Sequence, residues 1–383
     1  MSEVRVIVAA TAFTKELDGL AASQLLADGV QTAVPDARVD IWSFPPPGRL
    51  LLALQRIVGG TVRTIPVTGA YGAPTVLPFL QVGPKTHPTA YVETDALFPA
   101  LTPATAARAD QATSFGLGEG LLHLLIDGTT RIVLLIGNHL AGDGGVGMLQ
   151  ALGAQIQASR RPDQRVANPL LTLTGLDASR PALMLQKATL TIMTDSRFTY
   201  TGLAGFSGML AARQHLAPRW QERFNTQLRL AEAQLAPARH ITIAGVPGSG
   251  AGGGLAGALL AVGGQAVVPF TPWFCDQVGL TVELRQADFL LTAAPVLTPA
   301  MGLVGGVVPL ARLARQFRVP SGIALQADHT PDPRLSRLFT DIYLTQVTGL
   351  MGSTTTGVWR RSLKVAGSEL LARFCQRQKQ PEN

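Results

Sequence analysis

Short apolar runs and helical patterns alternate at both ends of the chain, and this alternation restricts the fold more than any other feature of the sequence. Near the amino terminus, a run over 4–9 precedes a helical pattern over 17–31 and a second run over 39–43. Near the carboxyl terminus, helical segments separate three further runs, at 288–292, 321–325 and 341–344. Strand–helix–strand units build parallel sheets covered by helices. We therefore predict an α/β fold with a Rossmann-like, doubly wound lobe formed by both termini.

The middle of the chain begins with a different pattern. Three short β-rich runs, at 65–67, 75–80 and 90–93, follow one another with Gly and Pro between them. Strands joined by such turns form an antiparallel meander rather than crossover units. The 383 residues are also about twice the usual length of one domain. We predict two domains, namely residues 1–60 with 286–383 as the Rossmann-like lobe, and residues 61–285 as an inserted α/β lobe.

Composition excludes several classes of protein. Only 15% of the residues are charged, against roughly 25% in an average soluble domain, and 40 Gly and 26 Pro indicate many tight turns. The net charge of +7 is scattered, apart from a cluster over 360–379 that fits the solvated face of a last helix. Apolar stretches fall short of the ~20 residues that cross a bilayer, and no signal-peptide pattern opens the chain. We expect no nucleic-acid partner, no membrane association and a cytoplasmic protein.

The residues that commonly bind metals have no metal-binding spacing. Cys275 and Cys375 lie far apart without a CxxC pair, and the six histidines form no HExxH motif. We therefore predict no metal-ligand set from spacing.

The strongest local signal is a buried run over 131–136 that leads into a glycine-rich loop over 137–145 and the start of a helix. Such a junction directs unpaired backbone amides toward an anion, and the candidate ligand-binding residues are Gly137, His139, Gly144 and Gly145. A tight turn that needs glycine for its backbone angles explains the same spacing equally well. Asp143 in this loop is either a helix cap or a functional carboxylate.

A second glycine-rich segment over 248–254 precedes an apolar helical pattern over 255–262. Its candidate ligand-binding residues are Gly248, Ser249, Gly250 and Gly253. The segment formally contains GxGxxG, but a dinucleotide site also needs an acidic residue about 20 positions later, and Asp276 is poorly placed for that role. The chain contains no Gly-Lys pair, so a GxxxxGK[ST] phosphate loop is excluded.

Together the two segments resemble the signatures of type II glycerate kinases. Residues 147–154 read Gly-Met-Leu-Gln-Ala-Leu-Gly-Ala, as in that family, and residues 247–254 read Pro-Gly-Ser-Gly-Ala-Gly-Gly-Gly for the family's Pro-Gly-Ala-Gly-Ala-Ala-Gly-Gly. Further similarity lies at 67–72 and 113–119, and the resemblance covers nearly the whole chain. It implies a two-domain glycerate kinase-like fold that uses ATP and magnesium to phosphorylate a small organic acid such as D-glycerate. Pairing with itself or with a related kinase stays open.

The chain departs from this family at charged positions. Thr11 and Thr14 stand where the family has an aspartate and a lysine, Phe115 replaces an arginine, and the segment 292–298 lacks a glutamate, an arginine and an aspartate. Phosphoryl transfer depends on such charges, so we expect the kinase activity to be weak or lost. The candidate catalytic residues that survive are Asp195 and Asp143. The alternative is an inactive pseudo-kinase that binds a phosphate-bearing ligand or a protein partner.

Overall fold

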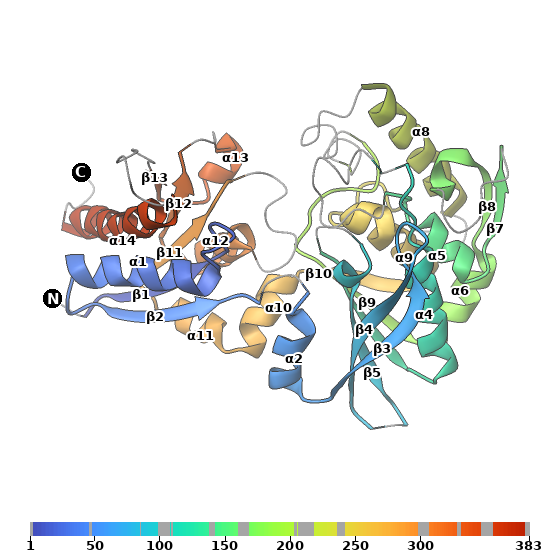
Figure 1. The fold of residues 1–383 in the computed structure, drawn as a ribbon, viewed down its shortest axis with the longest axis horizontal. Coiled ribbons are helices and arrows are strands. Elements are labelled where there is room, and N and C mark those ends of the chain that lie inside the picture. The colour runs from blue at the N-terminus through green and yellow to red at the C-terminus, as the bar shows by residue number, and fades with distance from the viewer. Residues whose placement is uncertain are drawn as a thin grey trace. The chain divides into compact units, whose positions relative to one another are not determined.

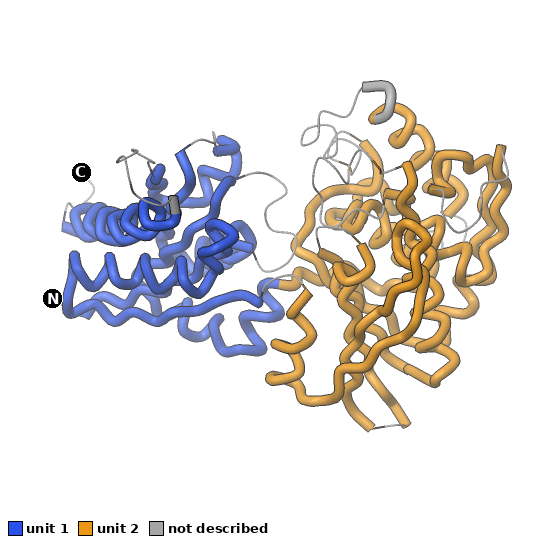
Figure 2. Tube along the Cα trace, in the orientation of Figure 1, with its two compact units in different colours: residues 1–46, 271–383 blue, residues 47–270 orange. Residues whose placement is uncertain are grey.

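The computed structural model describes residues 3–45, 48–84, 86–98, 108, 110–137, 142–159, 168–202, 205, 218–235, 242–297, 306–327, 331–345 and 355–379. It divides into two compact units (Figure 2). Unit 1 comprises residues 1–46 and 271–383, and unit 2 comprises residues 47–270.

These divisions differ from the expected ones at 60/61 and 285/286. Helix α2 (Leu50–Val58) packs on three strands of unit 2, whereas Cys275, Leu280 and Leu284 belong to the core of unit 1. The unit against which these apolar side chains are buried sets the boundaries. The sequence pattern alone does not show which unit that is.

Unit 1 contains a fully parallel, five-stranded sheet with the order β13-β12-β11-β1-β2 (Figure 1). Its strands are β1 (Arg5–Ala10), β2 (Arg38–Ser43), β11 (Phe289–Ala294), β12 (Ser321–Gln326) and β13 (Asp341–Thr345). The first and last parts of the chain meet where β1 pairs with β11. The strand order reverses at this pair, which confirms the Rossmann-like, doubly wound lobe built from both termini.

Alternate residues of β1 face two different apolar layers. Val6 and Val8 join the core with α1 (Gly19–Ala33) and α14 (Thr355–Lys379), whereas Ile7 and Ala9 join the core with α11 (Leu280–Arg285) and α12 (Val307–Gln316). The remaining helices of this part of the chain are α10 (Phe270–Gln277) and α13 (Pro333–Ser336). Helices α1 and α14 pack closely at Gly29 and Gly367. A Cβ at either glycine would overlap the backbone of the other helix, so the close contact requires glycine at both positions.

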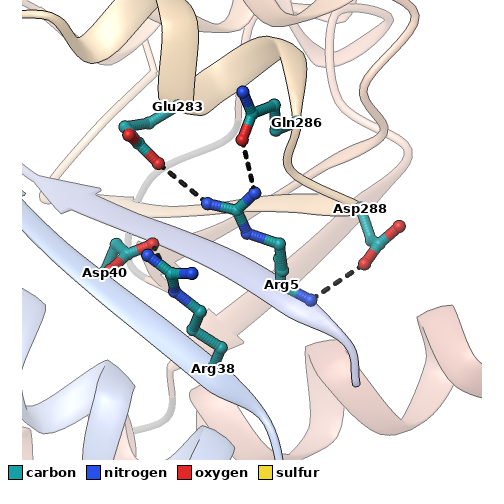
Figure 3. Close-up of polar contacts among 6 residues, drawn as sticks. All are labelled: Arg5, Arg38, Asp40, Glu283, Gln286 and Asp288. Atoms are coloured by element: carbon teal, nitrogen blue, oxygen red, sulfur yellow. Dashed lines mark hydrogen bonds and ion pairs between the residues drawn. The ribbon is translucent and has the colours of Figure 1, made fainter. Parts of the chain in front are cut away.

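Hydrogen bonds from Arg5 join the start of β1 to the segment that leads into β11 (Figure 3). Its guanidinium donates to Gln286 at 2.6 Å and to Glu283 at 2.8 Å, and its backbone amide donates to the Asp288 carboxylate at 2.8 Å. The contact therefore joins residues that lie about 280 positions apart in the chain.

Unit 2 contains a six-stranded sheet with the order β10-β9-β6-β5-β4-β3. Its strands are β3 (Thr61–Thr68), β4 (Pro74–Val82), β5 (Thr89–Glu93), β6 (Arg131–Leu135), β9 (Thr189–Met193) and β10 (Gly264–Val268). Strands β3, β4 and β5 form the predicted antiparallel meander, and β5, β6, β9 and β10 are mutually parallel. Since β3 and β5 both oppose β4, five strands point the same way. Their ends define what we call the carboxyl edge of unit 2.

Helices and a small ribbon complete unit 2 (Figure 1). The helices are α4 (Phe115–Ile126), α5 (Val146–Ala151), α6 (Ser179–Leu185), α8 (Pro218–Leu235) and α9 (Leu255–Val262), with 3-10 turns η1 (Thr94–Ala96), η2 (Pro169–Thr172) and η4 (Ala251–Gly254). Strands β7 (Gln155–Ala158) and β8 (Leu173–Asp177) form an antiparallel pair. Helix α8 buries Phe224, Leu228, Ala231 and Leu235 at its helical spacing, which confirms core packing for that segment.

Candidate active site

The carboxyl edge of unit 2 brings together acidic side chains from different strands. In the sheet register, Glu93 of β5 pairs with Leu135 of β6, and Leu135 pairs with Met193 of β9. Asp95, Gly137 and Asp195 each lie two residues beyond this level. Ligands of open α/β sheets commonly bind outside the carboxyl ends of parallel strands. This edge is therefore the candidate site.

Glu93 and Asp95 form an acidic pair where β5 ends. Glu93 is 3% exposed and accepts the amides of Gly48 (2.7 Å) and Leu51 (3.4 Å) at the start of α2. Burial raises the pKa of Glu93, and those hydrogen bonds oppose the rise. Burial and the neighbouring charge of Glu93 raise the pKa of Asp95 to about 7. One carboxyl group at this edge is therefore poised to exchange a proton near neutral pH.

Gly137 is a glycine because Asp95 approaches it closely. A Cβ at this position would overlap the Asp95 carboxylate, and the Gly137 amide donates a hydrogen bond to that carboxylate. The first predicted ligand-binding residue is thus committed to an acidic side chain. His139 lies outside the described residues.

Asp195 follows β9 at the same edge and is 7% exposed. The Thr194 amide beside it donates to the Val268 carbonyl of β10 at 3.0 Å, so the sheet holds this turn in place. Ser196 donates its amide to the Thr194 hydroxyl at 3.2 Å. The Asp195 carboxylate therefore lies in a hydrogen-bonded turn at the end of β9, the strand between β6 and β10.

Asp143 occupies a different environment, because it is fully buried. One of its carboxylate oxygens accepts the Ser114 amide (2.6 Å), the Ser114 hydroxyl (2.8 Å) and the Gly147 amide (3.1 Å), and the other accepts the Gly145 amide (3.0 Å). Burial raises the pKa of Asp143, and these hydrogen bonds act against the rise. All of these donors belong to the protein and join the starts of α4 and α5. The geometry supports a positioning role for Asp143.

The two glycine-rich segments pack against each other. The Gly144 amide donates to the Gly253 carbonyl at 3.0 Å, and a Cβ at Gly254 would overlap Gly144. Tyr200 is fully buried between the segments, where its hydroxyl donates to the Gly144 carbonyl at 2.8 Å and its amide donates to the Ser249 hydroxyl at 2.8 Å. The glycines thus permit a close contact between two loops that lie about 100 residues apart in sequence.

Most of the amides that we expected to bind an anion already have protein acceptors. The Gly145 amide donates to Asp143, the Gly248 and Gly250 amides donate to the Phe198 carbonyl, and the Ser249 amide donates to Val246. A phosphate at these atoms would have to displace those bonds. In addition, the described residues 242–247 contain turns and no strand, whereas a dinucleotide-binding GxGxxG directly follows a strand.

In unit 1 the pair of strand ends at which the order reverses carries no charged side chain among the described residues. The Thr11 amide and hydroxyl both donate to the Ala293 carbonyl, at 3.0 and 3.2 Å, and the Thr292 hydroxyl donates to the Ala9 carbonyl at 2.6 Å. Ala294, Pro295 and Val296 continue the chain there. Neutral hydrogen bonds therefore join β1 to β11 where the resembling family places charges.

No group of three or more His, Cys, Asp or Glu side chains stands close enough to hold a metal within the described ranges. Magnesium in phosphotransfer sites takes only one or two protein carboxylates, and phosphate oxygens and waters supply its other ligands. Asp95 and Asp195, on the strands that flank β6, fit that smaller requirement. Of the chain's described helices, none is long and apolar enough to cross a membrane.

Sequence reasoning missed Glu93 and Asp95. The signal was present, because Glu93 ends the predicted strand over 90–93 and Asp95 follows it. Once the strands are parallel, the carboxyl end of this strand shares an edge with Gly137 and Asp195. What the sequence could not supply was the order of the strands, which makes Asp95 a neighbour of Gly137.

The fold and the site define a two-unit α/β protein with buried carboxylates where the parallel strands of a mixed sheet end. A sequence model of the glycerate kinase family matches residues 6–325. The chain therefore belongs to the glycerate kinase family.

Individual relatives agree with this assignment. A glycerate 2-kinase of Escherichia coli K12 is 26% identical over 83% of this chain and 84% of its own length. A glycerate kinase of Halalkalibacterium halodurans is 24% identical over 54% of this chain, which spans only about half of that relative, 55%. A solved structure described as a glycerate kinase 2, from Salmonella typhimurium LT2, superimposes with a TM-score of 0.63 at 20% identity and covers 99% of this chain. That structure shares the fold.

Proposed function

We propose that the protein transfers the γ-phosphoryl group of ATP to a hydroxyl group of a small organic acid such as D-glycerate. Membership of the glycerate kinase family over residues 6–325 is the observation that carries the proposal. The acidic carboxyl edge of unit 2 supports it, because carboxylates that orient a hydroxyl and accept its proton are a recurring requirement of phosphoryl transfer. No observation on the described residues favours the inactive alternative.

Asp195 and Asp95 divide the work at the carboxyl edge. Asp195 orients the acceptor hydroxyl from the rigid end of β9. Asp95 accepts the proton, since a group with a pKa of about 7 is substantially ionised at neutral pH yet basic enough to take a proton. Asp143 acts indirectly by fixing the starts of α4 and α5, and the packed glycine loops hold the same region rigid.

Magnesium, when bound with ATP, neutralises charge on the transferring phosphate. Asp195 would hold it from the protein side, with the nucleotide supplying further oxygens. The neutral residues at Thr11, Thr14 and Phe115 remove charges that would otherwise assist. Because loss of one such contact typically slows catalysis by about 10²–10³, turnover is slow compared with an ordinary kinase.

The test is a coupled assay of ADP release by the purified full chain with magnesium, ATP and D-glycerate. Asp195→Asn should lower kcat by at least about 10²-fold, because it removes the orienting carboxylate at nearly constant shape. Asp127→Asn is the matched control, since Asp127 is half-exposed and pairs only with His123 in the described structure. Equal ADP release by the wild type, by Asp195→Asn and by a blank without acceptor would reject the proposed function.

A further inference from the structure

The turn between β3 and β4 buries a hydroxyl group that makes no hydrogen bond within the described part of the chain. The turn closes with a hydrogen bond from the Gly69 amide to the Ala73 carbonyl at 2.7 Å. At its centre, the Tyr71 hydroxyl is shielded from solvent and makes no hydrogen bond to any residue that the structure describes. Burial raises the pKa of Tyr71, so this group is a neutral donor at physiological pH. A buried polar atom without a partner is costly and needs an explanation.

A cation and a carboxylate lie in the segment that crosses this turn. The Arg108 guanidinium stacks over the Tyr71 ring at 4.0 Å from its centroid, and the Thr113 amide donates to the Ala70 carbonyl at 2.9 Å. A turn brings Gln111 to Arg108: the Gln111 amide donates to the Arg108 carbonyl at 3.0 Å, and Arg108 Nε donates to the Gln111 side chain at 3.1 Å, which leaves the two terminal nitrogens of the guanidinium for a ligand. Within that turn, Asp110 has a carboxylate oxygen that is buried and, like Tyr71, lacks a hydrogen bond to the described chain.

This cluster lies at the carboxyl edge of unit 2, where the acidic side chains of the candidate site also lie. Strand β3 runs in the same direction as β5, so the turn after Thr68 leaves the sheet on the side where Glu93 ends β5. The backbone carbonyl of Asp110 accepts the Asn168 amide at 3.3 Å, and the Asn168 side chain donates to the Gly142 carbonyl at 2.9 Å. The cluster is therefore tied to the loop that carries Asp143.

The three groups together require a particular ligand chemistry. A guanidinium pairs best with a carboxylate, which it can bind through two parallel hydrogen bonds. The unpaired phenol hydroxyl is satisfied by a ligand oxygen that accepts its hydrogen bond, and the unpaired carboxylate oxygen by a ligand hydroxyl that donates to it. We infer that Tyr71, Arg108 and Asp110 form the subsite that binds the carboxylate and a hydroxyl of the acceptor acid.

This inference rests on the proposed function and names the residues that recognise its acceptor. It also accounts for Phe115, which stands where the resembling kinases have an arginine. Arg108 supplies a cation from the segment that precedes α4, so acceptor recognition is retained with a different residue.

Tyr71→Phe is the sharpest test. The variant keeps the ring under Arg108 and removes only the unpaired hydroxyl, so the melting temperature of the free protein should be unchanged or higher. Its KM for D-glycerate should rise several-fold, on the order of 3- to 10-fold, with kcat nearly unchanged. A purely structural role predicts the reverse, namely a lower melting temperature and an unaltered KM, and that result would overturn the subsite.

Arg108→Ala should raise the KM for D-glycerate on the order of 10- to 100-fold, and Arg108→Lys should recover only part of this loss because a lysine lacks the planar pair of donors. Arg63→Ala is the control, since Arg63 is exposed on β3 and donates to Gln81. A KM for Arg108→Ala within two-fold of the wild type would contradict the inference even if the wild type phosphorylates D-glycerate.

Failure of the proposed function is distinguishable. If the wild type releases no ADP, the subsite is measured by calorimetric titration with D-glycerate, with glycerol, which lacks the carboxylate, and with propionate, which lacks the hydroxyl. Binding of D-glycerate alone that is lost in Arg108→Ala supports the subsite without the kinase activity. Absence of D-glycerate binding in the wild type overturns both.

Discussion

The parallel sheet of unit 1 and the mixed sheet of unit 2 each have an edge where parallel strands end, and the chemistry at the two edges is very different. In unit 1, the ends of β1 and β11 are joined by hydroxyl and amide hydrogen bonds between Thr11, Thr292 and backbone carbonyls. In unit 2, the ends of β5 and β9 carry Glu93, Asp95 and Asp195. The difference shows that, within one chain of the glycerate kinase family, strand ends of the same kind can carry either neutral hydrogen bonds or buried carboxylates.

The largest expected effect concerns the residue that organises the acidic edge. Asp143→Ala leaves the Ser114, Gly145 and Gly147 donors buried without an acceptor, so it should lower the free energy of unfolding by about 3–5 kcal/mol. Urea denaturation measures this loss. Asp36→Ala, at an exposed residue in the turn before β2, is the control. A loss below about 1 kcal/mol would contradict the positioning role of Asp143, because the carboxylate would then not hold the starts of α4 and α5 together.

A smaller effect concerns pH. Because the folded-state pKa of Asp95 is raised to about 7, the folded protein keeps a proton that the unfolded chain releases near pH 4. The contribution of Asp95 to stability therefore falls as pH rises from about 4 to about 7, and is constant above that. Asp95→Asn keeps an acceptor for the Gly137 amide and removes this dependence.

The measurement is the free energy of unfolding at pH 5 and pH 8. Relative to wild type, Asp95→Asn should gain stability at the higher pH by about 1–3 kcal/mol, with Glu93 sharing in the titration. Asp36→Asn, at an exposed residue in the turn before β2, is the control. A pH-independent difference would mean that Asp95 titrates at its ordinary pKa, and that the acidic edge holds no proton near neutrality.

The smallest effect tests the neutral edge. Thr11→Asp restores the charge that the resembling kinases have, but replaces a hydroxyl that donates to Ala293 with a carboxylate that cannot. It should cost about 1 kcal/mol in urea denaturation, whereas Thr11→Ser should cost little. If Thr11→Asp instead left stability unchanged and raised kcat, the strand ends of unit 1 would still contribute to catalysis. The two units would then differ at their edges only in the residues they carry.

Local patterns predicted much of the fold. The alternation at both ends gave the doubly wound sheet, and the three runs between 65 and 93 gave the meander, because both depend on periodicity within a few residues. The boundaries moved because α2, α10 and α11 are assigned by burial against distant strands. The packing of Gly144 against Gly253 depended on the same long-range geometry, which no spacing rule contains.

The candidate site was predicted in part. Asp195 and Gly137 lie at the carboxyl edge, but the partner of Gly137 is Asp95, whose raised pKa arises from burial beside Glu93 and has no sequence signature. Tyr71 and Arg108 lie 37 positions apart and meet only because the segment before α4 crosses the β3–β4 turn. Contacts of this kind require the three-dimensional structure.

The join of β1 with β11 and the close crossing of α1 with α14 have a consequence for synthesis on the ribosome. Residues of the first strand wait for a partner that is translated more than 270 residues later, and α1 waits for the last helix of all. Unit 2 is a continuous stretch and can fold as soon as it emerges. Strand β2 and helix α1 can cover β1 early, but the edge of β1 that pairs with β11 and the face of α1 that packs on α14 lack their partners until late in translation, so these surfaces are where a holding chaperone would act.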